Sequence, residues 1–226
     1  MKKMRLSIHA LSLAMTLFWV FAGIAKADRV AIIDAGSSGS RLFVYELAQQ
    51  QVKLIYPLTE EQKKESRGRP LSSIANHTDS VKVFLQNMTQ GYQAEDVPLY
   101  IMATAGMRLK PKAQADSIYA LLEQQPMLNG YTIKAAMTIS GQYEGLYGWL
   151  AANYENGLIG FAPSTTSETL TYLQQPKGIL EIGGASMQIA FNTTATGNQI
   201  LSRPGLGNIY CKSWLGGGVD QIYKNT

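Results

Sequence analysis

Short apolar runs and helical spacings alternate along this chain. Apolar runs predict strands over residues 30–33, 41–47, 52–56, 97–103, 131–139, 178–182 and 187–192. Apolar residues spaced by three or four predict amphipathic helices over residues 79–88, 111–125 and 142–154. Thr78 is the expected N-cap of the first helix, and Pro111 stands at a tolerated position in the first turn of the second. Strands mixed with helices indicate an α/β layered fold.

Two polar stretches separate these elements. Residues 59–70 are highly charged and include Gly68 and Pro70, which predicts an exposed loop. Residues 163–177 are rich in Ser, Thr and Gln and predict an exposed connector.

The N-terminal residues 1–27 have the pattern of a secretory signal peptide. Three of the first five residues are basic, Leu6–Ile24 is mostly apolar, and Ala25-Lys26-Ala27 fits a cleavage site. The alternative is an uncleaved membrane anchor, but polar residues such as His9 interrupt the run. We expect cleavage before Asp28, no stable membrane anchor afterwards, and an exported protein that is periplasmic or secreted.

The basic excess of the chain lies in this predicted signal. Residues 1–27 hold four of the 20 basic side chains and no acidic one, so residues 28–226 balance 16 basic against 16 acidic side chains. This balance gives no support for nucleic acid as a partner or for attraction to a membrane surface.

Residues 28–226 contain one cysteine and one histidine. Cys211 cannot form an intrachain disulfide, and we expect it to be a buried small hydrophobic residue. With His77 as the one histidine, a zinc site or a Ser-His-Asp triad has little support. Carboxylates, hydroxyls, amides and backbone groups are left to carry any chemistry.

One pattern occurs twice, roughly 150 residues apart. Val30–Ser38 and Lys177–Ala185 are each an apolar strand that ends in a carboxylate, Asp34 or Glu181, followed by a Gly-rich turn and a second apolar strand. The separation is too long for a solenoid repeat. It fits two related lobes, each of which offers one hairpin turn to a shared cleft.

Such turns suit phosphate chemistry. Glycine lets several backbone N–H groups point at one anion, serine hydroxyls add donors, and a carboxylate can bind a hard divalent cation directly or through water. The alternative is a pair of ordinary hairpins that need glycine for their backbone conformation. Either turn alone favours that alternative, whereas the repetition with an acid at the same place favours a phosphate site.

Two further segments add candidate chemistry. Glu144 lies in a Gly-flanked segment where a helix is predicted to begin, so it is a candidate general base or a helix-capping acid. Thr104 and Arg108 follow a predicted strand in Ala103–Arg108. Thr104 could donate to phosphate or hold a water, and Arg108 could bind phosphate or form a structural ion pair.

Together these segments resemble the successive conserved regions of the apyrase family, the ecto-nucleoside triphosphate diphosphohydrolases. The resemblance covers residues 30–225, with the regions in family order. They are Asp34–Arg41, Ala103–Arg108, Glu144–Trp149 with Asn153, and Gly183–Gln188.

The resemblance implies a two-lobed actin-like (RNase H-like) ATPase fold, with a first lobe over residues 28–140 and a second, incomplete lobe over residues 141–226. It implies that Glu144 is the catalytic base and that Ser186 and Gln188 hold the attacking water. Asp34 and Glu181 would bind Mg²⁺ or Ca²⁺ through water. The implied phosphate-binding residues are Ser37, Ser38, Gly39, Ser40, Arg41, Thr104, Gly183, Gly184 and Ala185. The implied reaction is direct attack of water on the terminal phosphate of nucleoside tri- and diphosphates.

The chain departs from the family pattern twice. Glu181 stands where the family usually has Asp, and the sequence ends at Thr226, soon after Gly216–Gln221, without the family's fifth region. These departures favour one alternative, a truncated apyrase that binds nucleotides without turnover. A second alternative is an exopolyphosphatase-like phosphohydrolase, against which the export signal and Glu144–Trp149 argue.

Overall fold

The computed structural model describes residues 29–48, 51–125, 127–161 and 169–224. Residues 1–28, which include the predicted signal peptide, and residues 163–168 of the predicted connector lie outside these ranges. The described chain divides into two compact units, with the division after Ile139. We call residues 29–48 and 52–139 the N-terminal unit and residues 140–224 the C-terminal unit.

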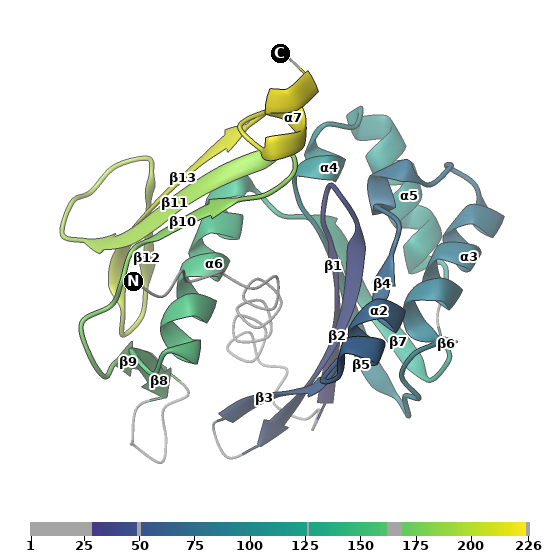
Figure 1. Ribbon diagram of the computed structural model, residues 1–226, viewed down its shortest axis with the longest axis horizontal. Helices are drawn as coiled ribbons and strands as arrows, with labels where there is room; N and C mark the ends of the chain where they lie inside the picture. Colours follow the sequence, from purple (N-terminus) through teal and green to yellow (C-terminus); the bar gives the residue numbers. More distant parts are fainter. Residues whose placement is uncertain (1–28, 49–50, 126, 162–168, 225–226) are drawn as a thin grey trace. The chain divides into compact units, whose positions relative to one another are not determined.

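The N-terminal unit is built on a mixed seven-stranded sheet, in the order β3-β2-β1-β5-β7-β6 with β4 beside β2 (Figure 1). The strands are β1 (Arg29–Ala35), β2 (Ser40–Ala48), β3 (Gln51–Tyr56), β4 (Arg67–Gly68), β5 (Val97–Ala103), β6 (Met127–Leu128) and β7 (Tyr131–Thr138). Strands β1, β5 and β7 are parallel, and β2 runs antiparallel to β1. The carboxyl ends of β1 and β5 therefore meet at one edge of the sheet, which brings the turns after them together.

Helices α3 (Thr78–Thr89) and α5 (Lys112–Glu123) cover one face of this sheet (Figure 1). Their apolar sides meet the inward-facing residues of β1, β2 and β5 in one core, which includes Ala31, Ile33, Leu42, Val44, Phe84, Leu85, Ile101, Ile118 and Leu122. Each fully buried aliphatic or aromatic side chain of this kind stabilises a fold by about 1.5–3 kcal/mol. The regularly spaced apolar residues that predicted these two helices are thus the residues that the helices bury.

The loop prediction for residues 59–70 is wrong in its first half, where helix α2 (Glu60–Glu65) forms. Thr59 and Gln62 make a capping box: the Thr59 hydroxyl accepts from the Gln62 N–H at 3.2 Å, and Gln62 Oε1 accepts from the Thr59 N–H at 3.2 Å. Acidic residues in the first turn and lysines in the last complement the helix dipole. The helix buries no residue, so hydrophobic periodicity gave no sign of it.

Two predicted caps also differ by one residue. The N-cap of α3 is His77, whose ring nitrogen accepts from the Ser80 N–H at 3.3 Å, and Thr78 is the first helical residue. Pro111 is the N-cap of α5 and not a residue of its first turn. Both helices nevertheless fall where the spacing predicted them.

The C-terminal unit packs helix α6 (Gly141–Glu155) against a four-stranded sheet of order β10-β11-β13-β12. These antiparallel strands are β10 (Ile179–Ile182), β11 (Ser186–Thr193), β12 (Ile200–Arg203) and β13 (Gly207–Leu215). Strand alternation buries Ser186, Gln188 and Ala190 on one face, while Leu180 and Phe191 are exposed on the other.

The remaining elements of this unit are the pair β8 (Ile159–Phe161) and β9 (Leu170–Tyr172) and the short helix α7 (Val219–Lys224). Strand β9 falls inside the predicted connector, so that prediction is wrong at residues 170–172. Strands β12 and β13 were not predicted. Cys211 on β13 is completely buried, as expected.

One buried amide fastens α6 to the start of the sheet. Asn153 Nδ2 donates to the Lys177 carbonyl at 3.0 Å and to the Trp149 carbonyl at 2.8 Å, and the Lys177 N–H donates to Asn153 Oδ1 at 2.8 Å. This two-way bond to Lys177 fixes where β10 begins relative to the helix. It therefore also sets the register of the residues that follow on β10 and β11.

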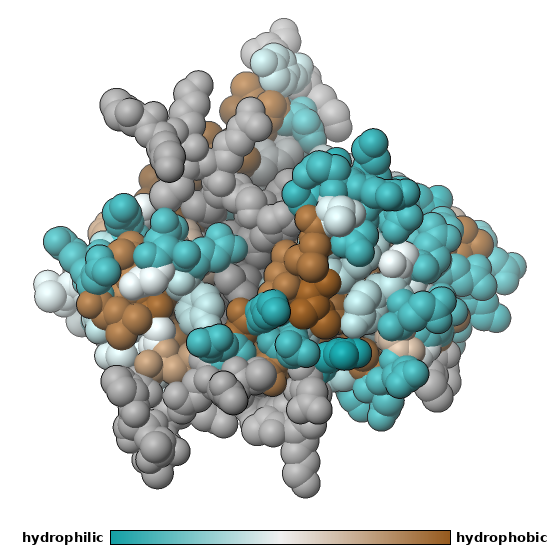
Figure 2. Space-filling view, turned by 60° about the horizontal axis from the view of Figure 1, so that its bottom comes forward, coloured by the Kyte–Doolittle hydropathy of each residue, from teal (hydrophilic) through white to brown (hydrophobic). Residues whose placement is uncertain are grey.

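Hydrophilic side chains predominate on the described surface shown in Figure 2, and the hydrophobic ones form local groups. Within the described residues, no helix combines the length and the apolar character that crossing a membrane requires.

Candidate functional site

The first candidate group lies where β1 turns into β2. Asp34 is 4% exposed and is the Cα partner of Arg41, so both side chains project from the same face of the sheet. Burial lowers the pKa of Arg41, and the Asp34 carboxylate opposes that shift. Among the described residues, the buried Arg41 Nε has no hydrogen-bond acceptor. A buried cationic donor without an acceptor is suited to an anionic oxygen.

The turn itself, Gly36–Gly39, offers backbone donors. None of its four N–H groups donates to a backbone or side-chain acceptor among the described residues. Ser37 and Ser38 add partly or fully exposed hydroxyls. Neighbouring N–H groups without acceptors are the basis of anion binding in Gly-rich turns.

Thr104 and helix α4 (Ala105–Arg108) lie against this turn. The Thr104 N–H donates to the Ala35 carbonyl at 3.2 Å, and the residue is almost completely buried. A Cβ on Gly106 would come within 2.9 Å of the Ser37 Cα, so α4 approaches the turn as closely as only glycine allows. The segment Ala103–Arg108 thus packs against the turn Gly36–Gly39.

Ser40 does not join Asp34 and Arg41. It is the Cα partner of Ala35, a core residue, so strand alternation turns its side chain toward the helix-covered face of the sheet. Its Oγ is buried without a hydrogen-bond partner among the described residues. The structure therefore separates this predicted phosphate ligand from the others on its strand.

The carbonyl groups of the second turn, Gly183–Ala185, accept hydrogen bonds from the loop after β13 and from the start of α7. The Val219 and Asp220 N–H groups donate to the Gly183 and Gly184 carbonyls, both at 2.9 Å, and the Gly216 N–H donates to the Ala185 carbonyl at 2.8 Å. The turn's carbonyl groups are thus occupied. The Gly184 and Ala185 N–H groups have no acceptor among the described residues.

A tightly packed cluster of polar side chains lies where α6 packs against β11, the strand that follows that turn along the chain. Glu144 is 6% exposed, in the first turn of α6 after the N-cap Ser140. Gln188 Nε2 donates to Glu144 Oε2 at 3.0 Å and to Ser186 Oγ at 2.7 Å. Ser186 Oγ lies 3.5 Å from Glu144 Oε2, at the limit of a hydrogen bond. The three predicted catalytic residues therefore come together around one carboxylate.

Glu181 lies beside this cluster. It is the Cα partner of Gln188 on neighbouring strands, so both side chains project from the same face. The strand pairing thus brings the second predicted metal ligand next to the predicted catalytic residues of the C-terminal unit.

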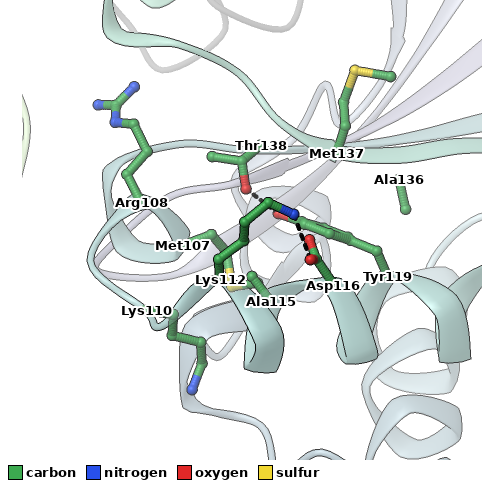
Figure 3. Close-up of a pocket in the computed structure, with 10 residues that line it drawn as sticks. All are labelled: Met107, Arg108, Lys110, Lys112, Ala115, Asp116, Tyr119, Ala136, Met137 and Thr138. Carbon is green, nitrogen blue, oxygen red and sulfur yellow. Dashed lines mark hydrogen bonds and ion pairs between the residues drawn. The ribbon is translucent and has the colours of Figure 1, made fainter.

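Arg108 has a different position. Its Nη1 donates to the Ile139 carbonyl at 3.1 Å, and Figure 3 shows its side chain pointing away from Lys112 and Asp116. It borders a hollow of about 410 Å³ beside α5 and the end of β7. In that hollow Lys112 pairs with Asp116 at 2.5 Å, and the hydroxyl groups of Tyr119 and Thr138 bond to each other. The polar groups of the hollow are therefore paired with each other, and no residue of Gly36–Gly39 or Gly183–Ala185 lines it.

Comparison with known proteins shows the family and the fold of the chain. The model of the GDA1/CD39 (nucleoside phosphatase) family matches residues 26–225. The chain belongs to this family. It is 31% identical to ectonucleoside triphosphate diphosphohydrolase 1 of Bos taurus, over 84% of this chain and 41% of that protein. It is 35% identical to the nucleoside-triphosphatase ntp-1 of Caenorhabditis elegans, over 79% of this chain and 33% of that protein. The chain thus spans less than half the length of these relatives.

A solved structure shows the fold that GDA1/CD39 family membership implies. A nucleoside triphosphate hydrolase from Neospora caninum superposes with a TM-score of 0.60 at 20% identity, over 85% of this chain and 45% of that chain. The fold is the actin-like α/β fold that the resemblance predicted.

The acidic groups of this GDA1/CD39 family chain fit a hydrated cation better than a cage of protein ligands. No three His, Cys, Asp or Glu side chains gather at one point among the described residues. Asp34 and Glu181 each bring one carboxylate next to a Gly-rich turn. Mg²⁺ usually keeps several waters and takes one or two carboxylates with substrate phosphates, so a single carboxylate beside a Gly-rich turn suits it.

Sequence reasoning missed two residues at the C-terminal site of this family member. Ser213 on β13 accepts from Gln188 Nε2 at 3.1 Å. Gly218 lies so close to the second turn that a Cβ would meet Gly184 backbone atoms at 2.4 Å. The run of three glycines at 216–218 could have indicated a close backbone approach. Ser213 gave no such indication, because it is a single serine on a strand that was not predicted.

Proposed function

We propose that this chain carries phosphate-binding and catalytic residues for hydrolysis of the terminal phosphates of nucleoside tri- and diphosphates. The observation that carries the proposal is the buried Glu144 carboxylate, which a side-chain amide and a hydroxyl contact at 3.0 and 3.5 Å. A buried carboxylate held in this way is oriented for proton transfer. Membership of the nucleoside phosphatase family supports phosphate esters of nucleosides as the substrate class.

Glu144 acts as the general base in the proposed reaction. It takes a proton from a water molecule whose oxygen attacks the terminal phosphorus, while the bond to the bridging oxygen breaks and the shortened nucleotide leaves with that oxygen. Ser186 and Gln188 orient the carboxylate and the water. A positioned base of this kind typically contributes ~10²–10⁴ in rate.

The two Gly-rich turns bind phosphate oxygens. Gly36–Gly39 supplies N–H groups and two serine hydroxyls, and Arg41 adds a half-buried guanidinium whose Nε is buried. The second turn supplies the Gly184 and Ala185 N–H groups. Transfer of a phosphoryl group depends chiefly on positioning and charge stabilisation, so donors of this kind are the main requirement.

Asp34 and Glu181 are the carboxylates that would each bind the water shell of Mg²⁺ or Ca²⁺ in this proposal. The cation would supply charge neutralisation on the phosphate oxygens when bound. Glu181 has one methylene more than the Asp usual in the family, so its carboxylate lies about one bond length farther from the backbone.

Export forms part of the proposal, because residues 1–27 have the pattern of a cleaved signal. N-terminal sequencing of the protein recovered from outside the cytoplasm is expected to start near Asp28. Recovery of the uncleaved chain in the cytoplasm alone would remove export from the proposal.

Phosphate release from ATP and from ADP by the whole chain tests the activity, with Mg²⁺, with Ca²⁺ and with a chelator. We expect cation-dependent release that falls at least 100-fold in Glu144→Gln, while calorimetry shows nucleotide binding nearly unchanged. Glu155→Gln, an exposed acid at the other end of α6, is the matched control and is expected to retain activity.

Three results would contradict this proposal. Nucleotide binding by the wild type without phosphate release would favour a non-catalytic binding module. Faster release from inorganic polyphosphate than from ATP would favour the exopolyphosphatase-like alternative. Equal loss of binding and of release in Glu144→Gln would make Glu144 a structural residue.

A further inference from the structure

Ser213 is a third hydrogen-bond partner of the Gln188 carboxamide, beside Glu144 and Ser186. Strand pairing sets it there, because Gln188 and Ser213 are Cα partners on β11 and β13 and so project from the same face of the sheet. Gln188 Nε2 lies 3.1 Å from Ser213 Oγ, 2.7 Å from Ser186 Oγ and 3.0 Å from Glu144 Oε2. Gln188 therefore has three acceptors around a nitrogen that carries two hydrogens.

The distances limit how these two hydrogens can be shared among the three acceptors. The Ser186–Glu144 separation of 3.5 Å is shorter than the hypotenuse of a right triangle whose sides are 2.7 and 3.0 Å. The two acceptors therefore subtend less than a right angle at Nε2. The two N–H bonds of a planar amide diverge by about 120°. The narrow angle between the two acceptors allows one N–H to be shared between Ser186 and Glu144, an arrangement that leaves the other for Ser213 at 3.1 Å.

We propose that Ser213 is a positioning residue that accepts the second N–H of Gln188 and so fixes the plane of its carboxamide at Glu144. An amide held by one N–H alone can rotate about that bond, whereas a second acceptor on the other side fixes the plane. With Nε2 committed on both sides, Gln188 Oε1 is the end left to accept a hydrogen from the reacting water. This role rests on the proposed function of Glu144, Ser186 and Gln188.

Hydrolysis kinetics of the whole chain give the first test. Ser213→Ala is expected to lower kcat about tenfold with KM within twofold, the effect of losing one hydrogen bond that orients a catalytic group. Ser213→Thr keeps the hydroxyl on a β-branched side chain and is expected to restore most of kcat. Ser202→Ala, a strand serine whose hydroxyl bonds Asn208 instead, is the matched control and is expected to leave kcat unchanged.

A double-mutant cycle separates positioning from a merely structural role. If Ser213 acts through Gln188, adding Ser213→Ala to Gln188→Ala lowers kcat by less than a further twofold. A full tenfold further loss, or a loss in Ser213→Ala that Ser213→Thr does not rescue, would overturn the proposal.

Nuclear magnetic resonance tests the same contact without any activity. The side-chain NH₂ signals of Gln188, identified by their loss in Gln188→Ala, are expected to exchange slowly with water in the wild type and several-fold faster in Ser213→Ala. Unchanged exchange and chemical shifts would overturn the proposal. Absence of hydrolysis by the wild type would instead remove the proposed function, and the exchange measurement would still decide whether Ser213 holds Gln188.

Discussion

Gln188 Nε2 lies 3.0 Å from Glu144 Oε2, although the two residues are 44 positions apart and come from a strand and a helix. Gln188 is 1% exposed, so this amide meets the carboxylate away from bulk water. A buried hydrogen bond to a charged group is stronger than one between neutral groups and contributes about 1.5–3 kcal/mol. The pair is therefore the point at which the candidate active site is most sensitive to substitution.

Gln188→Ala should lower kcat for ATP hydrolysis about 10- to 100-fold, because Glu144 loses the amide that orients it. Steady-state kinetics at saturating nucleotide measure the loss. The comparison variant is Gln142→Ala, whose amide bonds the Asn198 carbonyl at 2.8 Å, and it should keep kcat within twofold. Equal kcat values for the two variants would show that Gln188 has no part in the reaction.

Arg41→Lys should weaken nucleotide binding about tenfold even though the charge is kept. A lysine lacks the planar fork of donors that the buried Arg41 Nε belongs to, and so it cannot replace a guanidinium bond to phosphate oxygens. Calorimetric titration with ADP measures the change. Lys53→Met removes an exposed charge on β3 and should have little effect. Unaltered ADP affinity in Arg41→Lys would take Arg41 out of the phosphate site.

Gly218→Ala should destabilise the protein by about 1–3 kcal/mol, because its Cβ would lie 2.4 Å from backbone atoms of Gly184, and backbone cannot yield as a flexible side chain does. Thermal unfolding should show a Tm lower by several degrees. A Cβ at Gly183 meets its nearest atom at 3.6 Å, so Gly183→Ala should change Tm far less. Equal Tm values for Gly218→Ala and the wild type would contradict the close packing of Gly218 against Gly184.

Asn153→Ala should cost about 1–3 kcal/mol of unfolding free energy, since it leaves the Lys177 N–H and carbonyl without their side-chain partner. Urea denaturation measures the loss. Asn156→Ala removes an amide at the exposed end of the same helix, which donates to Ala152, and should cost less than about 1 kcal/mol. A smaller loss for Asn153 than for Asn156 would contradict the role of Asn153 in joining α6 to β10.

Burial raises the pKa of Cys211 to about 12, from an ordinary value of 9.0. In the unfolded chain the thiol loses its proton above pH 9, while the folded chain keeps it until about pH 12. The unfolded state therefore binds fewer protons in this window, and stability falls as pH rises from 9 toward 12. Cys211→Ala should flatten that fall in urea denaturation, and the native thiol should resist alkylation at pH 8. Rapid native alkylation would contradict its burial.

The local pattern of the sequence was sufficient to predict most of the fold. Strands β1 and β5 are continuous apolar runs, and α3 and α5 bury residues three or four positions apart, so burial agrees with the predicted period in these segments. Helix α6 differs, because every residue from Glu144 to Asn153 is buried and its burial is not confined to one side. Helix α2 was missed because capping and charge hold it without any buried residue. Strands β12 and β13 were missed because neither is a continuous buried apolar run: β12 has no fully buried residue, and β13 buries only Ile209 and Cys211 between partly exposed positions.

The sequence by itself determined the candidate residues, because the acid followed by a Gly-rich turn occurs twice and Glu144 lies in a Gly-flanked helix start. Tertiary structure decided what these residues touch. Strand pairing placed Gln188 between Glu181 and Ser213, strand alternation turned Ser40 away from Arg41, and helix packing set Glu144 against β11. Side-chain direction alternates with every residue of a strand, so a contact depends on register, and register is fixed only when the strands pair and pack.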